Sequence, residues 1–193
     1  MKRLSIMVVV IGIVSIALAC GGGAVEPDEK GALNIILDDF KFTPDTIELK
    51  SGRKVRMILN NKSKEHDHGF MIGLDVVRQG GAASGYTSDF FEGVDINVIG
   101  PAKTVIVGGA FVTWEGDAVE DSDGGDADGA QGFMVLIGPS SESTVIEFTV
   151  PEKYGEWEFA SFENDGERYE DGMRGTVKVF PCLASTNSRQ SRC

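Results

Sequence analysis

The sequence predicts an all-β domain, a β-sandwich or a β-barrel. Short runs of alternating apolar and polar residues recur along the chain, which is the period-two pattern of half-buried strands. Turn residues separate these runs, and 25 of the 193 residues are Gly. No stretch of the body shows a sustained 3.6-residue periodicity with helix caps. Alternating strands joined by such turns are typical of sandwiches and barrels.

The first strands are predicted from the clearest alternation. Residues 33–37 open the domain, and residues 40–42 alternate apolar and charged side chains. A turn at Thr43-Pro44-Asp45 leads into residues 46–50, which alternate again and stop at Ser51-Gly52. Further strands are expected at residues 55–59, 70–74, 105–107, 111–114, 133–137, 144–150, 157–160 and 176–180.

Residues 75–132 break this even spacing, and we interpret them as a long insertion between two strands of the sandwich. A hairpin is predicted near residues 103–114, and an acidic loop over residues 115–132. Long loops in compact domains are usually functional or disordered.

The carboxylates of the acidic loop suit a hard cation such as calcium. Their spacing does not match an EF-hand, and a solvated loop extended by its own charge repulsion is the favoured alternative. The candidate calcium ligands are Asp121, Asp123, Asp126 and Asp128.

The first 19 residues are predicted to be a secretory signal peptide. A positive start, Met1-Lys2-Arg3, precedes an apolar run over residues 4–18 that is too short for a comfortable membrane span. Cys20 follows a small residue and resembles the lipidated Cys of a bacterial lipobox, with ordinary cleavage as the alternative. We therefore expect an extracytoplasmic, membrane-anchored lipoprotein of the cell envelope, periplasmic or at the cell surface. Residues 20–31 are expected to be its polar tether.

The charge of the chain excludes one class of partner. Lys and Arg number 18 against 30 Asp and Glu, giving a net charge of −12. Removing Lys2 and Arg3 with the signal peptide leaves 16 basic residues and a net charge of −14. A nucleic-acid partner is not expected, because phosphate backbones require a basic footprint. A redox protein or another surface protein is a candidate partner.

The C-terminal tail, residues 181–193, is polar and holds two of the three cysteines. With Cys20 lipidated, Cys182 and Cys193 form an even pair that would close a short loop in an oxidising compartment. Two exposed thiols are the alternative. In either case the domain over residues 32–180 does not need this disulfide to hold its core.

No enzyme class is favoured by the sequence. The nucleophile elbow, the Walker loop, the dinucleotide-binding turn and the H-E-x-x-H zinc motif are all missing. Pairs of carboxylates are plentiful, but nothing singles out one pair for hydrolysis. We therefore expect a protein without catalytic residues.

Three segments carry a family resemblance. They are residues 40–52 (FKFTPDTIELKSG), residues 59–61 (LNN) with 68–72 (HGFMI), and residues 148–151 (FTVP), 155–159 (GEWEF) and 172–179 (GMRGTVKV). In this order, behind a secretion signal, they resemble the cupredoxins, the plastocyanin- and azurin-like blue-copper proteins. The resemblance implies a Greek-key β-sandwich, copper as the cofactor and electron transfer as the family role.

The resemblance also assigns the ligand positions. In the family, two His nitrogens and a Cys thiolate hold copper with a weak axial Met. His68 matches the first His and Met173 the axial Met. Ser161 stands at the Cys position and Arg168 at the position of the second His. The resemblance therefore implies a degenerate site that has lost its thiolate and one imidazole.

A weaker copper site is one hypothesis for the residues that remain. His66 and His68 are two residues apart, which on an extended segment places both on one face, and Met173 is the third candidate ligand. Alternatively, His66 is a solvated turn residue and His68 a retained residue of the fold. The fixed charge of Arg168 counts against a bound cation.

Three functions stay open at this point. The first is copper handling or binding without electron transfer. The second is electron transfer at an unconventional copper site. The third is a structural or interaction module at the cell surface, without metal or steadied by calcium at the acidic loop.

Overall fold

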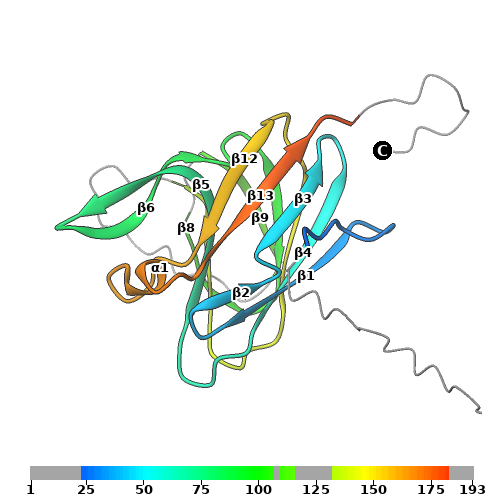
Figure 1. Ribbon diagram of the computed structural model, residues 1–193. Helices are drawn as coiled ribbons and strands as arrows, with labels where there is room; N and C mark the ends of the chain where they lie inside the picture. Colours follow the sequence, from blue (N-terminus) through cyan, green and yellow to red (C-terminus); the bar gives the residue numbers. More distant parts are fainter. Residues whose placement is uncertain (1–22, 107–108, 116–131, 183–193) are drawn as a thin grey trace, which may run out of the picture.

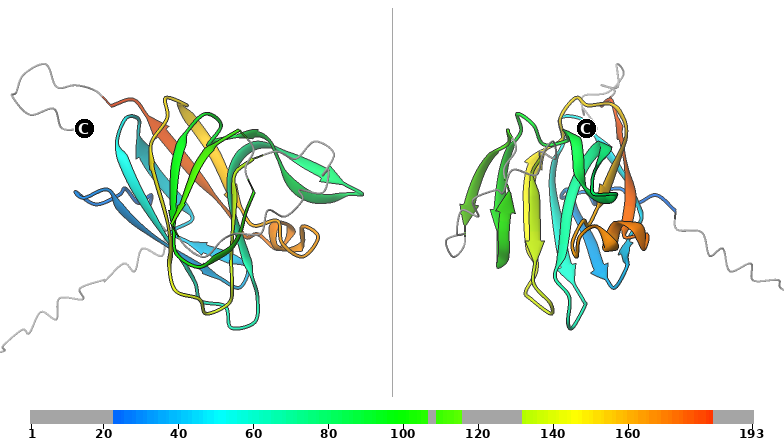
Figure 2. Two further views of the ribbon diagram at one scale, coloured as in Figure 1. Left: turned by 180° about the vertical axis from the view of Figure 1, so that it is seen from behind. Right: turned by 90° about the vertical axis from the view of Figure 1, so that its left-hand side faces the viewer.

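The computed structural model describes residues 23–106, 109–115 and 132–182. Over these residues the chain forms thirteen strands and one short helix. The strands make two sheets that pack face to face (Figures 1 and 2). The predicted β-sandwich is confirmed.

The first sheet has six strands, and its order differs from the order in the sequence. β1 runs parallel to β4 and β7 runs parallel to β9, whereas the other neighbours are antiparallel. In spatial order the strands are β2 (Lys41–Thr43), β1 (Ala32–Asp38), β4 (Lys54–Asn61), β11 (Thr144–Thr149), β7 (Asp95–Ile99) and β9 (Phe111–Glu115).

The second sheet has seven strands. β13 runs parallel to β3, and β6 pairs only with the outer half of β5. In spatial order the strands are β3 (Thr46–Lys50), β13 (Arg174–Phe180), β12 (Gly155–Ala160), β5 (His68–Gln79), β10 (Met134–Ile137) and β8 (Ala102–Ile106), with β6 (Ala82–Asp89) beside β5. The helix α1 (Glu167–Glu170) is a single turn between β12 and β13.

The core lies between the sheets, and in strands such as β1, β3, β4 and β11 it is formed by every second residue. In β1, Ile35 and Leu37 are fully buried, whereas the intervening Ile36 is exposed. The period-two alternation in the sequence is therefore the inside–outside alternation of the sandwich.

The predicted hairpin near residues 103–114 is wrong. β8 lies in the second sheet and β9 in the first, so the two strands do not pair. Alternation identifies a strand but does not specify its neighbour, and here the chain changes sheets near Gly109, whose φ is +77°.

The segment predicted as an insertion supplies strands to both sheets. β6 and β7 were not predicted, because β6 is rich in Ala, Ser and Gly and β7 is only five residues long. With β8 and β9, they extend the sandwich beyond the strands that carry the family resemblance. The acidic residues 116–131 lie outside the described residues, as do the candidate calcium ligands.

The predicted tether pairs in part with the domain. Val25 forms a parallel bridge with Ile47, and its N–H donates to the carbonyl of Thr46 at 3.0 Å. Glu26 forms an ion pair with Lys50 at 2.8 Å. The composition of residues 24–31 indicated only a polar linker, and this pairing with β3 was not predicted.

The remaining predictions at the two ends are only partly covered by the structure. Cys20 and Cys193 lie outside the described residues. Cys182 is disulfide-bonded, and its N–H donates to the Ser51 hydroxyl at 3.3 Å. Among the described residues, no helix has the length and apolar character that a membrane span requires.

A second apolar cluster lies outside the main core, where β5 and β6 project from the sandwich. Tyr86 of β6 packs edge-on against Phe162, and Phe162 stacks on Tyr169 of α1. The Tyr86 hydroxyl donates to Glu158 at 3.1 Å. The cluster fastens the β5–β6 arm to the loop that follows β12.

We predict that Gly73→Ala destabilises the protein by about 1–3 kcal/mol, the usual range for overpacking. A Cβ at Gly73 would lie 2.5 Å from three atoms of the Tyr86 side chain. Urea denaturation of the variant measures the loss. Gly23→Ala is the control, since no described atom lies within 4 Å of a Cβ there. Equal stability of the two variants would contradict close packing of Tyr86 on β5.

Candidate metal centre

The four positions that match copper ligands lie at one end of the sandwich. His68 begins β5, Ser161 follows β12, Arg168 is in α1 and Met173 precedes β13. All four are buried, Arg168 being the most exposed at 7%. The parent strands β5, β12 and β13 are neighbours in the second sheet, so the topology brings the four positions together.

Backbone hydrogen bonds connect these positions. The Gly69 N–H donates to the Ser161 hydroxyl at 3.1 Å, and the Ser161 N–H donates to the Met173 carbonyl at 3.2 Å. The Met173 N–H in turn donates to the Arg168 carbonyl at 2.9 Å. These hydrogen bonds join strand β5 to the loop between β12 and β13.

His68 is a buried imidazole without a hydrogen-bond partner among the described residues. Asp39 lies nearest, with 3.6 Å between its Oδ1 and the His68 Nε2, which is longer than a hydrogen bond. Burial lowers the pKa of His68, and the positive charge of Arg168 lowers it further, against the opposing effect of Asp39. The ring is therefore neutral at pH 7.

The turn between β1 and β2 covers this end of the sandwich and holds Arg168. The Arg168 guanidinium lies over the Phe40 ring, 4.9 Å from its centroid, and Phe40 has a φ of +66°. Hydrogen bonding from Ser63 lowers the pKa of Asp39, burial opposes this effect, and the charge of Arg168 lowers the pKa by a smaller amount. The Asp39 carboxylate thus lies within reach of the charge of the guanidinium.

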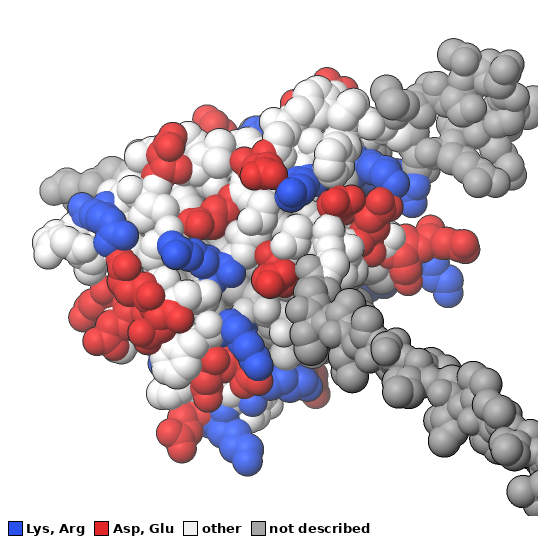
Figure 3. Space-filling view, in the orientation of Figure 1, with Lys and Arg blue, Asp and Glu red and all other residues white. Residues whose placement is uncertain are grey.

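Glu163 supplies a second carboxylate near Arg168. Its Oε1 lies 3.1 Å from the point where a Cβ on Gly69 would stand. Burial raises the pKa of Glu163, as does the negative charge of Asp67, whereas Arg168 lowers it. Acidic side chains also gather over α1, where Figure 3 shows them as a red cluster; they include Asp165, Glu167, Glu170 and Asp171.

His66 does not share a strand with His68. It lies in the bend before β5, where its N–H donates to the Ser63 hydroxyl at 3.0 Å and its carbonyl accepts from Asn61 at 2.9 Å. The period-two argument assumed an extended strand over both residues, and β5 begins only at His68, so that argument does not apply to His66. Both rings act on Asp39, so they lie at the same end of the sandwich.

These residues do not fit a blue-copper centre. At the position that the resemblance assigns to the thiolate stands the Ser161 hydroxyl, which already accepts a hydrogen bond, and at the position of the second imidazole stands Arg168, a permanent cation. Across the part of the chain that the structure describes, no three His, Cys, Asp or Glu side chains are arranged to hold a metal ion. His68 and Met173 are the only described residues at the four positions that retain the ligand types of the family.

The fold assignment depends on the order of the strands. β1 beside β4 and β3 beside β13 are parallel pairs in opposite sheets, and the ligand positions lie where β5, β12 and β13 meet. The fold is cupredoxin-like. No protein-family model and no curated protein matches the sequence.

Solved structures with a similar fold are distant in sequence. A reduced auracyanin from Roseiflexus castenholzii is 15% identical over 78% of this chain and 98% of its own, with a TM-score of 0.44. Auracyanin A, a blue copper protein from Chloroflexus aurantiacus, is 12% identical over 82% of this chain and 100% of its own, with a TM-score of 0.40. A copper-containing nitrite reductase from Thermus scotoductus is 15% identical over 77% of this chain and 30% of its own, with a TM-score of 0.41. At these identities and TM-scores the likenesses carry no inference about this protein.

Sequence analysis gave Asp39 no role at this end of the sandwich, and it gave Phe40 a place only in the first segment of the family resemblance. Asp39, Phe40 and Glu163 lie far from His68 in the sequence, and none stands at a ligand position. The structure brings them together because the β1–β2 turn and the loop after β12 meet at the start of β5. No signal in one sequence specifies that meeting.

We predict that the burial of neutral His68 makes stability fall as the pH drops below 6.5. The unfolded side chain titrates near 6.5 and the folded one below it, so in this window the unfolded state binds more protons. The free energy of unfolding, measured by urea denaturation from about pH 8 to about pH 5, should decrease more steeply for the wild type than for His68→Gln. Parallel curves for the two proteins would contradict a lowered pKa at His68.

Proposed function

We propose that this protein is an extracytoplasmic cupredoxin-like binding protein without an electron-transfer centre, anchored to the cell envelope through Cys20. The observation that carries the proposal is the Arg168 guanidinium, buried beside neutral His68 at the position of a copper ligand. The anchor and the compartment follow from the leader sequence and remain predictions.

The first supporting argument is the missing thiolate. Blue-copper electron transfer requires a soft sulfur ligand that mixes with copper and a second imidazole. Ser161 offers a hydroxyl, which is a hard and neutral donor. Cys182 follows Met173 by nine residues, which is about 30 Å along an extended strand. Its sulfur therefore cannot take the place of the missing thiolate.

The second supporting argument is the charge of Arg168. A guanidinium stays protonated at every physiological pH, so it cannot lose its proton to make room for a metal ion. The Phe40 ring lies 4.9 Å from the guanidinium, and the charge of Arg168 lowers the pKa of both Asp39 and Glu163. A copper ion bound by His68 would be repelled by this fixed cation.

Copper handling through His68, Met173 and His66 is the second candidate function. One observation favours it: both ring nitrogens of His68 are buried without a hydrogen-bond partner among the described residues. An imidazole and a thioether are ligand types that suit Cu(I), which prefers soft donors.

Copper titration of the mature protein distinguishes these candidates. We predict that neither Cu(I) nor Cu(II) binds stoichiometrically at this end and that copper leaves the melting temperature unchanged, because a ligand specific for the folded state would raise it. Metal analysis after dialysis and thermal denaturation provide the measurements. Binding at one copper per chain that is lost in His68→Ala but kept in His66→Ala would overturn the proposal in favour of copper handling.

Restoring the two lost ligands tests the residue assignment itself. In the double variant Ser161→Cys and Arg168→His, we expect copper to produce an intense visible thiolate-to-copper band, since the four positions would again offer two imidazoles, a thiolate and a thioether. The single variant Ser161→Cys is the control and should remain pale, because Arg168 is still present. A folded, colourless double variant would show that the ligand positions are misassigned.

A further inference from the structure

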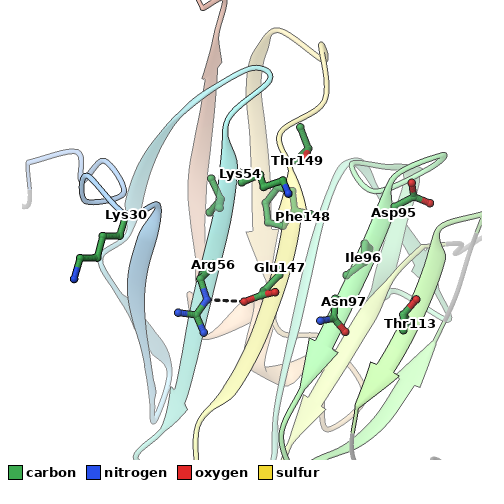
Figure 4. Close-up of a pocket in the computed structure, with 11 residues that line it drawn as sticks. Lys30, Lys54, Arg56, Asp95, Ile96, Asn97, Thr113, Glu147, Phe148 and Thr149 are labelled. Carbon is green, nitrogen blue, oxygen red and sulfur yellow. Dashed lines mark hydrogen bonds and ion pairs between the residues drawn. The ribbon is translucent and has the colours of Figure 1, made fainter. Parts of the chain in front are cut away.

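A polar groove of about 450 Å³ crosses the outer face of the first sheet (Figure 4). Its walls come from β4, β11, β7 and β9, and it shares no residue with the His68 end of the molecule. Volumes of this size are typical of small-ligand sites.

One row of polar side chains forms part of the floor. Arg56, Glu147, Asn97 and Thr113 are successive cross-strand neighbours on four adjacent strands. The strands are about 4.8 Å apart, so the row offers a hydrogen-bonding group at each step of that length. Arg56 and Glu147 form an ion pair at 2.6 Å, drawn as a dashed line in Figure 4.

One acceptor of this row is not satisfied by the protein. The Asn97 Oδ1 is buried, and no described residue donates a hydrogen bond to it. The Asn97 amide and the Thr113 hydroxyl can each both donate and accept. Buried polar atoms ordinarily have a partner, and a ligand group that donates to the Asn97 Oδ1 would supply one.

The groove is cationic at one side. Within the described residues, neither the Lys30 nor the Lys54 side chain has an ion-pair partner, and both line the groove. Figure 4 shows Lys54 reaching from β4 toward β11. On a protein with a net charge of −12, these unpaired cations mark a place for an anionic group.

An exposed aromatic ring stands beside the groove. Phe111 is 65% exposed and pairs in register with Asp95, which lines the groove on the same face. Flat apolar rings of this kind stack on the apolar face of a pyranose. The Asp95 carboxylate next to it accepts hydrogen bonds from sugar hydroxyls.

We propose that this groove binds an acidic oligosaccharide across the strands of the first sheet. The carboxylate of a uronic acid would meet the ammonium group of Lys54, and hydroxyls of the following sugars would pair with Asn97 and Thr113. A sugar unit is comparable in length to the strand spacing, so successive units can meet successive strands. The proposal does not depend on whether copper binds at His68.

Calorimetric titration of the mature protein with tetragalacturonate tests this site. We expect binding that weakens with added salt, and no binding of the neutral counterpart galactotetraose under the same conditions. Lys54→Gln should weaken binding by about tenfold, the loss expected for one charged hydrogen bond. Asn97→Ala should weaken it as well. Lys178→Gln, which removes a cation from the second sheet, is the matched control and should bind like the wild type.

Three outcomes would overturn the proposal. The first is no binding of tetragalacturonate to a folded protein at low salt. The second is equal binding of tetraglutamate, which would assign the groove to acidic peptides. The third is a loss on Lys54→Gln with no change on Asn97→Ala, which would leave only a charge contact. Thermal denaturation of each variant verifies that it is folded.

Discussion

The permanent charge of Arg168 is the constraint on which the ligand end of this sandwich depends. A buried guanidinium is unfavourable unless it is paired or covered. Here the Phe40 ring covers it, and the carboxylates of Asp39 and Glu163 offset its charge. The same charge, together with burial, keeps His68 neutral. The β1–β2 turn thus covers one residue whose charge acts on three titratable side chains, beside the larger effects of burial on His68 and Glu163 and of the Ser63 hydrogen bond on Asp39.

The strands between β5 and β10 give the molecule two features that the remaining strands would not provide. The β5–β6 arm builds a second apolar cluster on the loop after β12, through Tyr86, Phe162 and Tyr169. At the other sheet, β7 and β9 widen the outer face and supply half of the polar groove. One segment of sequence therefore packs against the loop after β12 and also contributes to the groove on the first sheet.

Sequence analysis could predict most of the sandwich because half-buried strands carry their own period. The strand expected at residues 46–50 is β3 to the residue, and the others differ mainly at their ends. Pairing was harder, as the strands at 102–106 and 111–115 show, since alternation contains no information about the partner. β6 was missed because Gly and Ser weaken its signal, and its burial comes from Tyr86 alone among large side chains.

The candidate site was predictable only where a motif preserved it. His68 and Met173 follow a family pattern, and the positions of Ser161 and Arg168 could be assigned by counting from it. The residues that decide the electrostatics, Asp39 and Glu163, belong to no motif and reach the site through the topology. The groove on the first sheet was likewise hidden, because its polar row has one member on each of four strands.

The hydrogen bonds and packing of the loop between β12 and β13 have a consequence for how the chain matures. A site closed by a metal couples folding to the supply of that metal, because the free energy of binding becomes part of the free energy of folding. In this protein Ser161, Met173 and Arg168 close the same loop with backbone hydrogen bonds, and the Phe162–Tyr169 stack secures it from outside. The conformation of this loop is therefore held by protein groups, and its folding does not have to wait for a metal ion.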